Sequence, residues 1–142
     1  MSFLQQISFV IKTDLKALDQ VLSRFEQLNQ PWIPRRDWLQ CQLALAEGFT
    51  NAVRHAHKNL PFETPIEIDL KLNQHSLEIR IIDCGPPFDL DGFLQSAKNQ
   101  EDQMADHGRG LPILQKIAAH LSYSRLDDHH NCLLIIKNFY ES

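Results

Sequence analysis

The sequence predicts an α+β fold in two layers, with a mixed, mostly antiparallel sheet covered on one face by helices. Two observations carry this prediction. Segments in which apolar and polar residues alternate come mostly in pairs joined by short polar turns, which favours β-hairpins. Stretches with apolar residues at helical spacing lie between them, and each such helix needs a sheet face on which to bury its apolar side. The predicted order is strand, helix, helix, two strands, loop, helix, two strands.

The N-terminal half is predicted to hold one strand and two helices. Residues 5–12 alternate between apolar and polar side chains, which is the period of a strand. Thr13 or Asp14 can cap the helix that follows, and that helix ends before Pro31. Its apolar residues at helical spacing are Leu15, Leu18, Leu22 and Phe25. The second helix is the longest element and continues to Ala56, with the periodic positions Trp38, Leu39, Leu43, Ala46, Thr50 and Val53.

The C-terminal half is predicted to hold a hairpin, a lid, a helix and two further strands. Residues 66–72 and 77–82 alternate on either side of a short polar turn and form the hairpin. A lid is expected at about 89–108, where a short helix can form near 90–97 and the rest is polar without a period. The last elements are a helix from Leu111 to Leu121 and strands at 121–126 and 132–138.

Length and composition indicate one soluble globular domain over residues 1–142, because 43% of the residues are hydrophobic and 23% are charged. A net charge of −4 argues against direct binding to nucleic acid or to an anionic membrane. The longest wholly apolar runs, such as 132–136, are far shorter than the roughly 20 residues of a membrane span. We therefore expect a cytoplasmic protein whose three cysteines, none of them in a CxxC pair, are reduced thiols.

One face of the long helix is unusually polar. Glu47, Asn51 and His55 stand four residues apart and share one stripe, and Arg54 lies beside it. One interpretation is an ordinary solvated helix face. The other is a functional site, in which Glu47 accepts a proton or orients a nucleophile and the side-chain oxygen of Asn51 binds Mg²⁺ beside substrate phosphates.

A carboxylate closes the second strand of the hairpin. Asp83 follows an apolar strand, so it needs a partner, which an exocyclic amino group of a bound base can supply. Gly85 has no Cβ and lets the backbone approach a planar ring. The alternative is that Asp83 caps the turn through its own backbone.

Two glycines precede the last helix. Gly108 and Gly110 at a helix N-terminus expose N–H groups that suit phosphate oxygens, and Arg109 adds a positive charge. The alternative is a flexible hinge, because the sequence has neither a Walker A motif nor a full dinucleotide-binding fingerprint. The histidine pairs at 55–57 and 129–130 are more typical of solvated or core side chains than of a zinc site.

Three motifs follow one another along the chain: Glu-Gly-Phe-Thr-Asn-Ala-Val-Arg-His-Ala at 47–56, Asp-Cys-Gly-Pro-Pro-Phe-Asp at 83–89 and Gly-Arg-Gly-Leu-Pro-Ile-Leu at 108–114. Together they resemble the N, G1 and G2 boxes of the GHKL ATPases, which have the Bergerat fold. Within that superfamily the chain looks most like the anti-sigma factor serine kinases of bacterial partner-switching systems, over nearly its whole length. It departs from the pattern at Pro87, where a second G1 glycine is common, and at Asn131-Cys132, where many relatives have Gly-Thr.

The resemblance implies a role for each motif residue. Glu47 matches the general base toward the substrate serine, and Asn51 matches the Mg²⁺ ligand. Arg54 and His55 complete the nucleotide-binding part of the first motif. Asp83 matches the residue that reads adenine, and Gly85 the glycine close to the base. Gly108, Arg109 and Gly110 match the lid and the start of the phosphate-binding helix.

The resemblance also implies a function with ATP and Mg²⁺ as cofactors. The expectation is an anti-sigma regulatory factor that phosphorylates a serine of an anti-anti-sigma antagonist with a STAS domain and binds a sigma factor or similar regulator. Relatives of this type are commonly homodimers. Two alternatives stay open: a non-enzymatic protein-binding module gated by ATP, and a detached catalytic domain of the histidine-kinase type.

Overall fold

A computed structural model describes residues 4–99 and 110–140, and it confirms the two-layer α+β architecture. One sheet of five strands has the order β1-β2-β3-β5-β4, and all four pairings are antiparallel. The strands are β1 (Gln5–Lys12), β2 (Pro65–Leu72), β3 (Ser76–Asp83), β4 (His120–Arg125) and β5 (Asn131–Asn138). The helices are α1 (Leu18–Glu26), α2 (Arg35–Asn51), α3 (Leu90–Asn99) and α4 (Gly110–Ile117), together with a 3-10 turn, η1 (Leu15–Ala17), and a π-helical segment, η2 (Ala52–Ala56).

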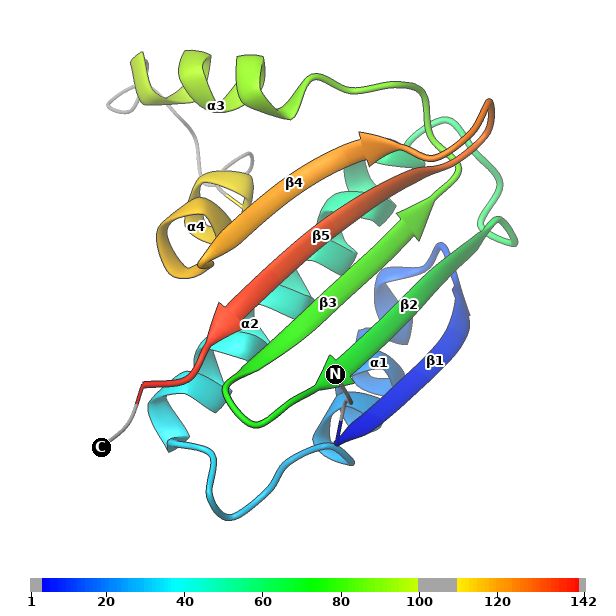
Figure 1. The fold of residues 1–142 in the computed structure, drawn as a ribbon. Coiled ribbons are helices and arrows are strands. Elements are labelled where there is room, and N and C mark those ends of the chain that lie inside the picture. The colour runs from blue at the N-terminus through cyan, green and yellow to red at the C-terminus, as the bar shows by residue number, and fades with distance from the viewer. Residues whose placement is uncertain (1–3, 100–109, 141–142) are drawn as a thin grey trace.

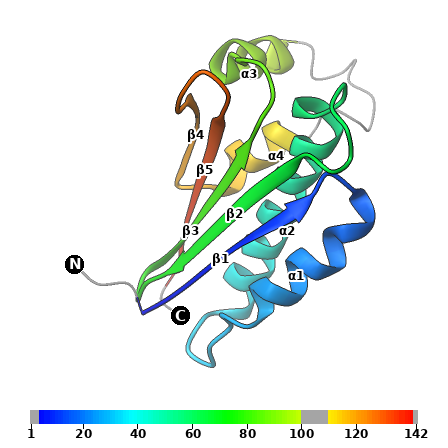
Figure 2. The ribbon, with the colours of Figure 1, turned by 90° about the vertical axis from the view of Figure 1, so that its right-hand side faces the viewer.

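The helices cover one face of the sheet and leave the other open. Figure 2 shows the sheet nearly edge-on, with α1, α2 and α4 on the same side. Figure 1 shows α2 running along the sheet and α3 lying beyond one end of the strands. The strand residues alternate accordingly: in β2, Ile66, Ile68 and Leu70 are buried, whereas Glu67 is exposed. Within the described part of the chain, every helix is too short or too polar to span a bilayer.

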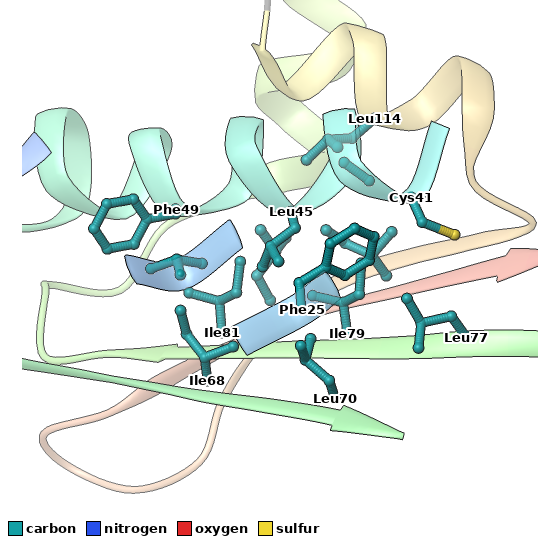
Figure 3. Close-up of a cluster of buried hydrophobic side chains, with 14 of the residues drawn as sticks. Phe25, Cys41, Leu45, Phe49, Ile68, Leu70, Leu77, Ile79, Ile81 and Leu114 are labelled. Carbon is teal, nitrogen blue, oxygen red and sulfur yellow. The ribbon is translucent and has the colours of Figure 1, made fainter. Parts of the chain in front are cut away.

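The core lies between α2 and the central strands. Figure 3 shows Leu45 and Phe49 of α2 above Ile68, Ile79 and Ile81 of the sheet, all of them almost completely buried. Gly48 allows this close approach, because a Cβ at that position would lie 2.5 Å from Ile81 Cδ1. The helix that carries the first motif is therefore held tightly against the strand that ends at Asp83.

The buried face of α2 differs from the predicted one. The residues of α2 that are buried include Trp38, Cys41, Ala44, Leu45 and Phe49. Leu39 and Leu43, which were predicted to face the core, are 46% and 41% exposed. Both sets recur at helical spacing, and α2 lies on the sheet with α1 and α4 at its flanks, so the outward-facing set stays in solvent.

The predicted long helix is not a regular α-helix to its end. The α-helix stops at Asn51, and the following residues form the π-helical segment η2, closed by a hydrogen bond of 2.9 Å from His57 N to Ala52 O. A π-turn rotates the residues that follow it relative to an α-helix, and such turns are frequent at functional sites. It leaves His55 exposed while His57 is buried.

The last helix is shorter than predicted. It ends at Ile117, and Leu121 belongs to β4. The chain leaves the helix at Ala119, whose N–H donates to Ile136 O of β5 at 2.8 Å and starts the sheet pairing. Leu121 has the helical spacing by coincidence, because as a half-buried strand residue it pairs with Ile135.

Candidate functional site

A single pocket of about 570 Å³ brings most of the predicted site residues together. It lies among the C-terminal half of α2, the segment η2, the loop after β3, the start of α4 and the strand β4. The predicted residues that line it are Glu47, Asn51, Arg54, His55 and Gly110. Gly108 and Arg109 lie outside the described residues. The polar stripe of α2 is thus the wall of a cavity and not a simple solvated face.

Glu47 stands at the N-terminus of α4. Its side chain is half-buried, and a Cβ added at Gly110 would lie 2.8 Å from Glu47 Oε2. A larger residue at this position would displace the flexible end of the Glu47 side chain from the start of α4. The first N–H groups of a helix favour a negative charge, so the position suits a carboxylate and links α2 to the helix that follows the predicted lid.

Asp83 lies behind the pocket wall rather than on it. It is 2% exposed, and its Oδ1 accepts hydrogen bonds from Gly85 N at 2.8 Å and from Asn131 Nδ2 at 2.9 Å. The bond from Gly85 confirms the turn-capping interpretation. Oδ2 accepts from the hydroxyl of Tyr123 at 2.5 Å. Because a carboxylate has about four acceptor positions, one position on Oδ2 remains for another donor.

Tyr123 lines the pocket and contacts Asp83 through its hydroxyl. Its ring lines the cavity, and it lies 5.7 Å from the ring of Phe88, which in turn lies 5.7 Å from Phe93. Burial and the hydrogen bond to Asp83 raise the pKa of Tyr123, so its hydroxyl keeps its proton and donates it to the carboxylate. Aromatic rings on the pocket wall beside the buried carboxylate of Asp83 are suited to a planar base that carries an amino group.

Two residues that the sequence analysis did not assign to the site fix the loop after β3. Asn131 Nδ2 also donates to Gly85 O and to Pro86 O, both at 3.1 Å, and Arg125 Nη1 donates to Gly85 O at 2.8 Å. The strand register explains this arrangement, because Asn131 pairs with Asp83 on one side and with Arg125 on the other. The departure from the family pattern at Asn131 was a signal for this position, whereas nothing in the sequence marked Tyr123 or Arg125.

Gly85 lies against the end of η2. A Cβ at this position would lie 2.5 Å from Ala56 O, which is a backbone atom that cannot move alone. We expect Gly85→Ala to lower the free energy of unfolding by about 1–3 kcal/mol, because the loop must shift off the helix. Thermal and urea unfolding measure this effect. The control is Gly92→Ala in α3, where the added Cβ meets only the flexible side chain of Asp89 and a smaller loss is expected. An unchanged stability of Gly85→Ala would contradict the tight contact.

Basic side chains lie at one end of the pocket, where η2 forms the wall. Arg54 and Lys58 are exposed there, and both line the cavity together with His55. Lys58 was not among the predicted site residues, because it follows the first motif. The pocket therefore combines an aromatic and carboxylate region with a basic region, as a nucleotide with a planar base and an anionic phosphate chain requires.

The comparison with family models gives one match, to the histidine kinase-like ATPase domain, over residues 11–137. The chain belongs to the histidine kinase-like ATPase domain family. No curated protein matches the sequence, so the assignment rests on the domain match. Membership of this ATPase family indicates ATP binding and an activity of the ATPase or kinase type, and the antiparallel α+β sheet is consistent with a Bergerat-type fold.

Proposed function

We propose that this ATPase domain is an ATP-dependent protein serine kinase that also sequesters a regulator. It binds Mg-ATP in the pocket and phosphorylates a serine of an anti-anti-sigma antagonist with a STAS domain. It binds a sigma factor or a similar regulator, and it acts as a homodimer. The support for the serine kinase branch is the resemblance of the three motifs, combined with the location of Glu47 and Asn51 in one pocket.

The observation that carries the proposal is the position of Glu47. Its carboxylate lies in the pocket one helical turn from Asn51 and beside the first residue of α4. A general base must be able to reach the hydroxyl from which it takes the proton, and a half-buried carboxylate on the wall of an open pocket can do so. Phosphoryl transfer otherwise asks mainly for positioning and neutralisation of charge, to which Arg54 and Lys58 contribute.

The residues present fit a Mg²⁺ ion that is bound largely by the nucleotide. Asn51 offers one hard oxygen ligand on the pocket wall. No group of three His, Cys, Asp or Glu that could hold a metal ion occurs in the described ranges 4–99 and 110–140. Mg²⁺ typically keeps several waters and takes few protein ligands beside substrate phosphates. When bound, it supplies charge neutralisation for the phosphate chain.

A second function is favoured by one observation, the contact between Glu47 and Gly110. A carboxylate packed at the N-terminus of α4 can be a structural latch. In that case ATP would only reorganise α4 and a surface for a partner, and the chain would be an ATP-gated binding module without phosphotransfer.

Calorimetry with ATP and ADP in the presence of Mg²⁺ tests the proposal at its first step. We expect binding at about micromolar Kd, equivalent to about −8 kcal/mol. Incubation with radiolabelled ATP and a STAS-domain protein encoded beside it then separates the two functions. Transfer of the label to a serine supports the kinase, and binding without transfer supports the gated module. If neither nucleotide binds, both functions fail.

A further inference from the structure

His57 is a buried titratable group that the proposed chemistry does not use. It directly follows η2 and is 1% exposed, in contrast to His55, which lines the pocket. Its two ring nitrogens both have partners. Nδ1 lies 2.7 Å from Thr13 Oγ1, and Nε2 accepts the N–H of Cys84 at 2.8 Å.

These partners define the protonation state of the ring. Nε2 accepts a backbone N–H, so it carries no proton. The hydroxyl of Thr13 donates to Thr64 O at 2.6 Å, so its oxygen is left to accept from Nδ1. The neutral ring with its proton on Nδ1 satisfies every bond, and no other form of histidine does.

The ring thereby connects two parts of the site. Cys84 lies between Asp83, the buried carboxylate, and Gly85, which packs on the carbonyl of Ala56. Residues 56 and 57 at the end of η2 therefore contact the segment 83–85 by a steric fit and by a hydrogen bond. Asn51, the last residue of α2, directly precedes η2. The distance between the base region and the phosphate region depends on this junction.

We propose that His57 is a positioning residue, whose neutral ring holds the segment 83–85 on the end of η2 and so fixes the carboxylate of Asp83 relative to Asn51 and Arg54. This inference rests on the proposed nucleotide site. It concerns a residue that touches no nucleotide itself but acts through the Cys84 N–H.

The proposal gives nucleotide affinity a pH dependence. Protonation of Nε2 would place two N–H donors against each other, so acid breaks the junction. Burial lowers the pKa of His57 below its ordinary value, and the charge of Asp83 raises it by a smaller amount. The groups that contact the ring are the Thr13 hydroxyl after β1 and the Cys84 N–H beside Asp83 at the end of β3, and the Thr13 hydroxyl is itself held by the Thr64 carbonyl. Only Asp83 among the groups named here is charged. The junction is therefore complete above the ordinary histidine pKa of about 6.5 and is lost as the pH falls through the lower pKa of the folded protein.

Two substitutions separate positioning from packing. His57→Phe fills the same space but leaves the Cys84 N–H without an acceptor. His57→Gln places an amide oxygen near the position of Nε2 and does not titrate. At about pH 7.5 we expect the Phe variant to bind ADP at least ~10-fold more weakly than wild type and the Gln variant to remain within ~3-fold. As the pH falls from about 7.5 through the lowered pKa of His57, wild type should lose several-fold more affinity than the Gln variant. The difference between wild type and the Gln variant is free of other pH effects on binding, because both proteins share the nucleotide phosphates and His55.

The outcomes of this experiment are distinct. A folded Phe variant that binds like wild type overturns the inference, and so does a Gln variant with the same pH profile as wild type. If the Phe variant does not fold, the pH profile of the Gln variant decides. Hydrogen exchange of the Cys84 amide provides a readout without nucleotide. Slow exchange in wild type and in the Gln variant, with faster exchange in the Phe variant, supports the junction. Exchange in the Phe variant that is as slow as in wild type opposes it. If wild type itself binds no nucleotide, the proposed function fails, and the exchange data alone test the junction.

Discussion

If Asp83 reads the base, as the resemblance of its motif implies, replacing it by asparagine should lower the affinity for ATP by about 10- to 100-fold, because a charged acceptor becomes an amide donor. An amino group of adenine then meets the N–H₂ of the new side chain, and two donors cannot pair. A purine with a carbonyl in place of that amino group meets a matching donor. We therefore expect the variant to reverse the preference and to bind inosine triphosphate more tightly than ATP.

The surroundings of Asp83 make this substitution a clean probe. An asparagine oxygen in the place of Oδ1 still accepts from Gly85 N and Asn131 Nδ2. The new N–H₂ group in the place of Oδ2 faces the hydroxyl of Tyr123, which can rotate and accept instead of donating. The hydrogen bonds of the buried side chain at position 83 can thus be kept in the variant, and the proton of the Tyr123 hydroxyl turns toward the pocket. Loss of affinity would then report base recognition rather than unfolding.

The measurement is a calorimetric titration of wild type and Asp83→Asn with ATP and inosine triphosphate, accompanied by thermal unfolding of each protein. Asp89→Asn, an exposed carboxylate in the same loop, is the matched control and should change neither affinity. Two results would contradict the assigned role: ATP binding by Asp83→Asn equal to wild type, or an equal loss for both nucleotides in a stable variant. The second result would mean that Asp83 shapes the pocket without reading the base.

The elements of the fold were predictable because their patterns are local. Alternation along residues 66–72 and 77–82 predicts the hairpin, and in the structure β2 and β3 pair antiparallel. The buried face of α2 was not predictable in the same way. Leu39 and Leu45 both belong to apolar sets at helical spacing, and only the positions of α1 and α4 decide which set is covered.

In the candidate site too, residues grouped by local spacing could be predicted, and residues brought together by long-range pairing could not. Glu47, Asn51 and His55 stand at helical spacing, so the sequence was sufficient to group them, and all three line one pocket. Tyr123 and Asn131 reach Asp83 only through the order of β3, β5 and β4, which depends on long-range pairing. No local pattern contains that information.

His57 illustrates how a local pattern can mislead. In the sequence it stands two residues from His55 and invites comparison with it. Two residues that stand two positions apart on a helix point to different sides, and the structure places one side chain at the pocket and the other in the core. Which side is covered depends on how the end of the helix meets the loop after β3, where His57 accepts the Cys84 N–H.

Substitution of Glu47 should have the largest effect on the reaction. We expect Glu47→Ala to lower the rate of phosphate transfer to the STAS-domain serine by about 10²- to 10⁴-fold, which is the usual contribution of a general base. The affinity for ATP should change little, because the base and phosphate contacts come from other residues. Transfer is measured as the mass increase of the STAS protein over time, and affinity by calorimetry.

Glu47→Gln is the variant that separates the two functions proposed for this carboxylate. Glutamine keeps the size and the contact with Gly110 at the start of α4, but it cannot accept a proton. If Glu47 is the base, the Gln and Ala variants lose transfer to a similar extent. If Glu47 only holds α4 in place, the Gln variant keeps most of the transfer activity while the Ala variant loses it. Transfer at the wild-type rate by both variants would exclude both roles, and the proton acceptor would then have to be sought outside the first motif.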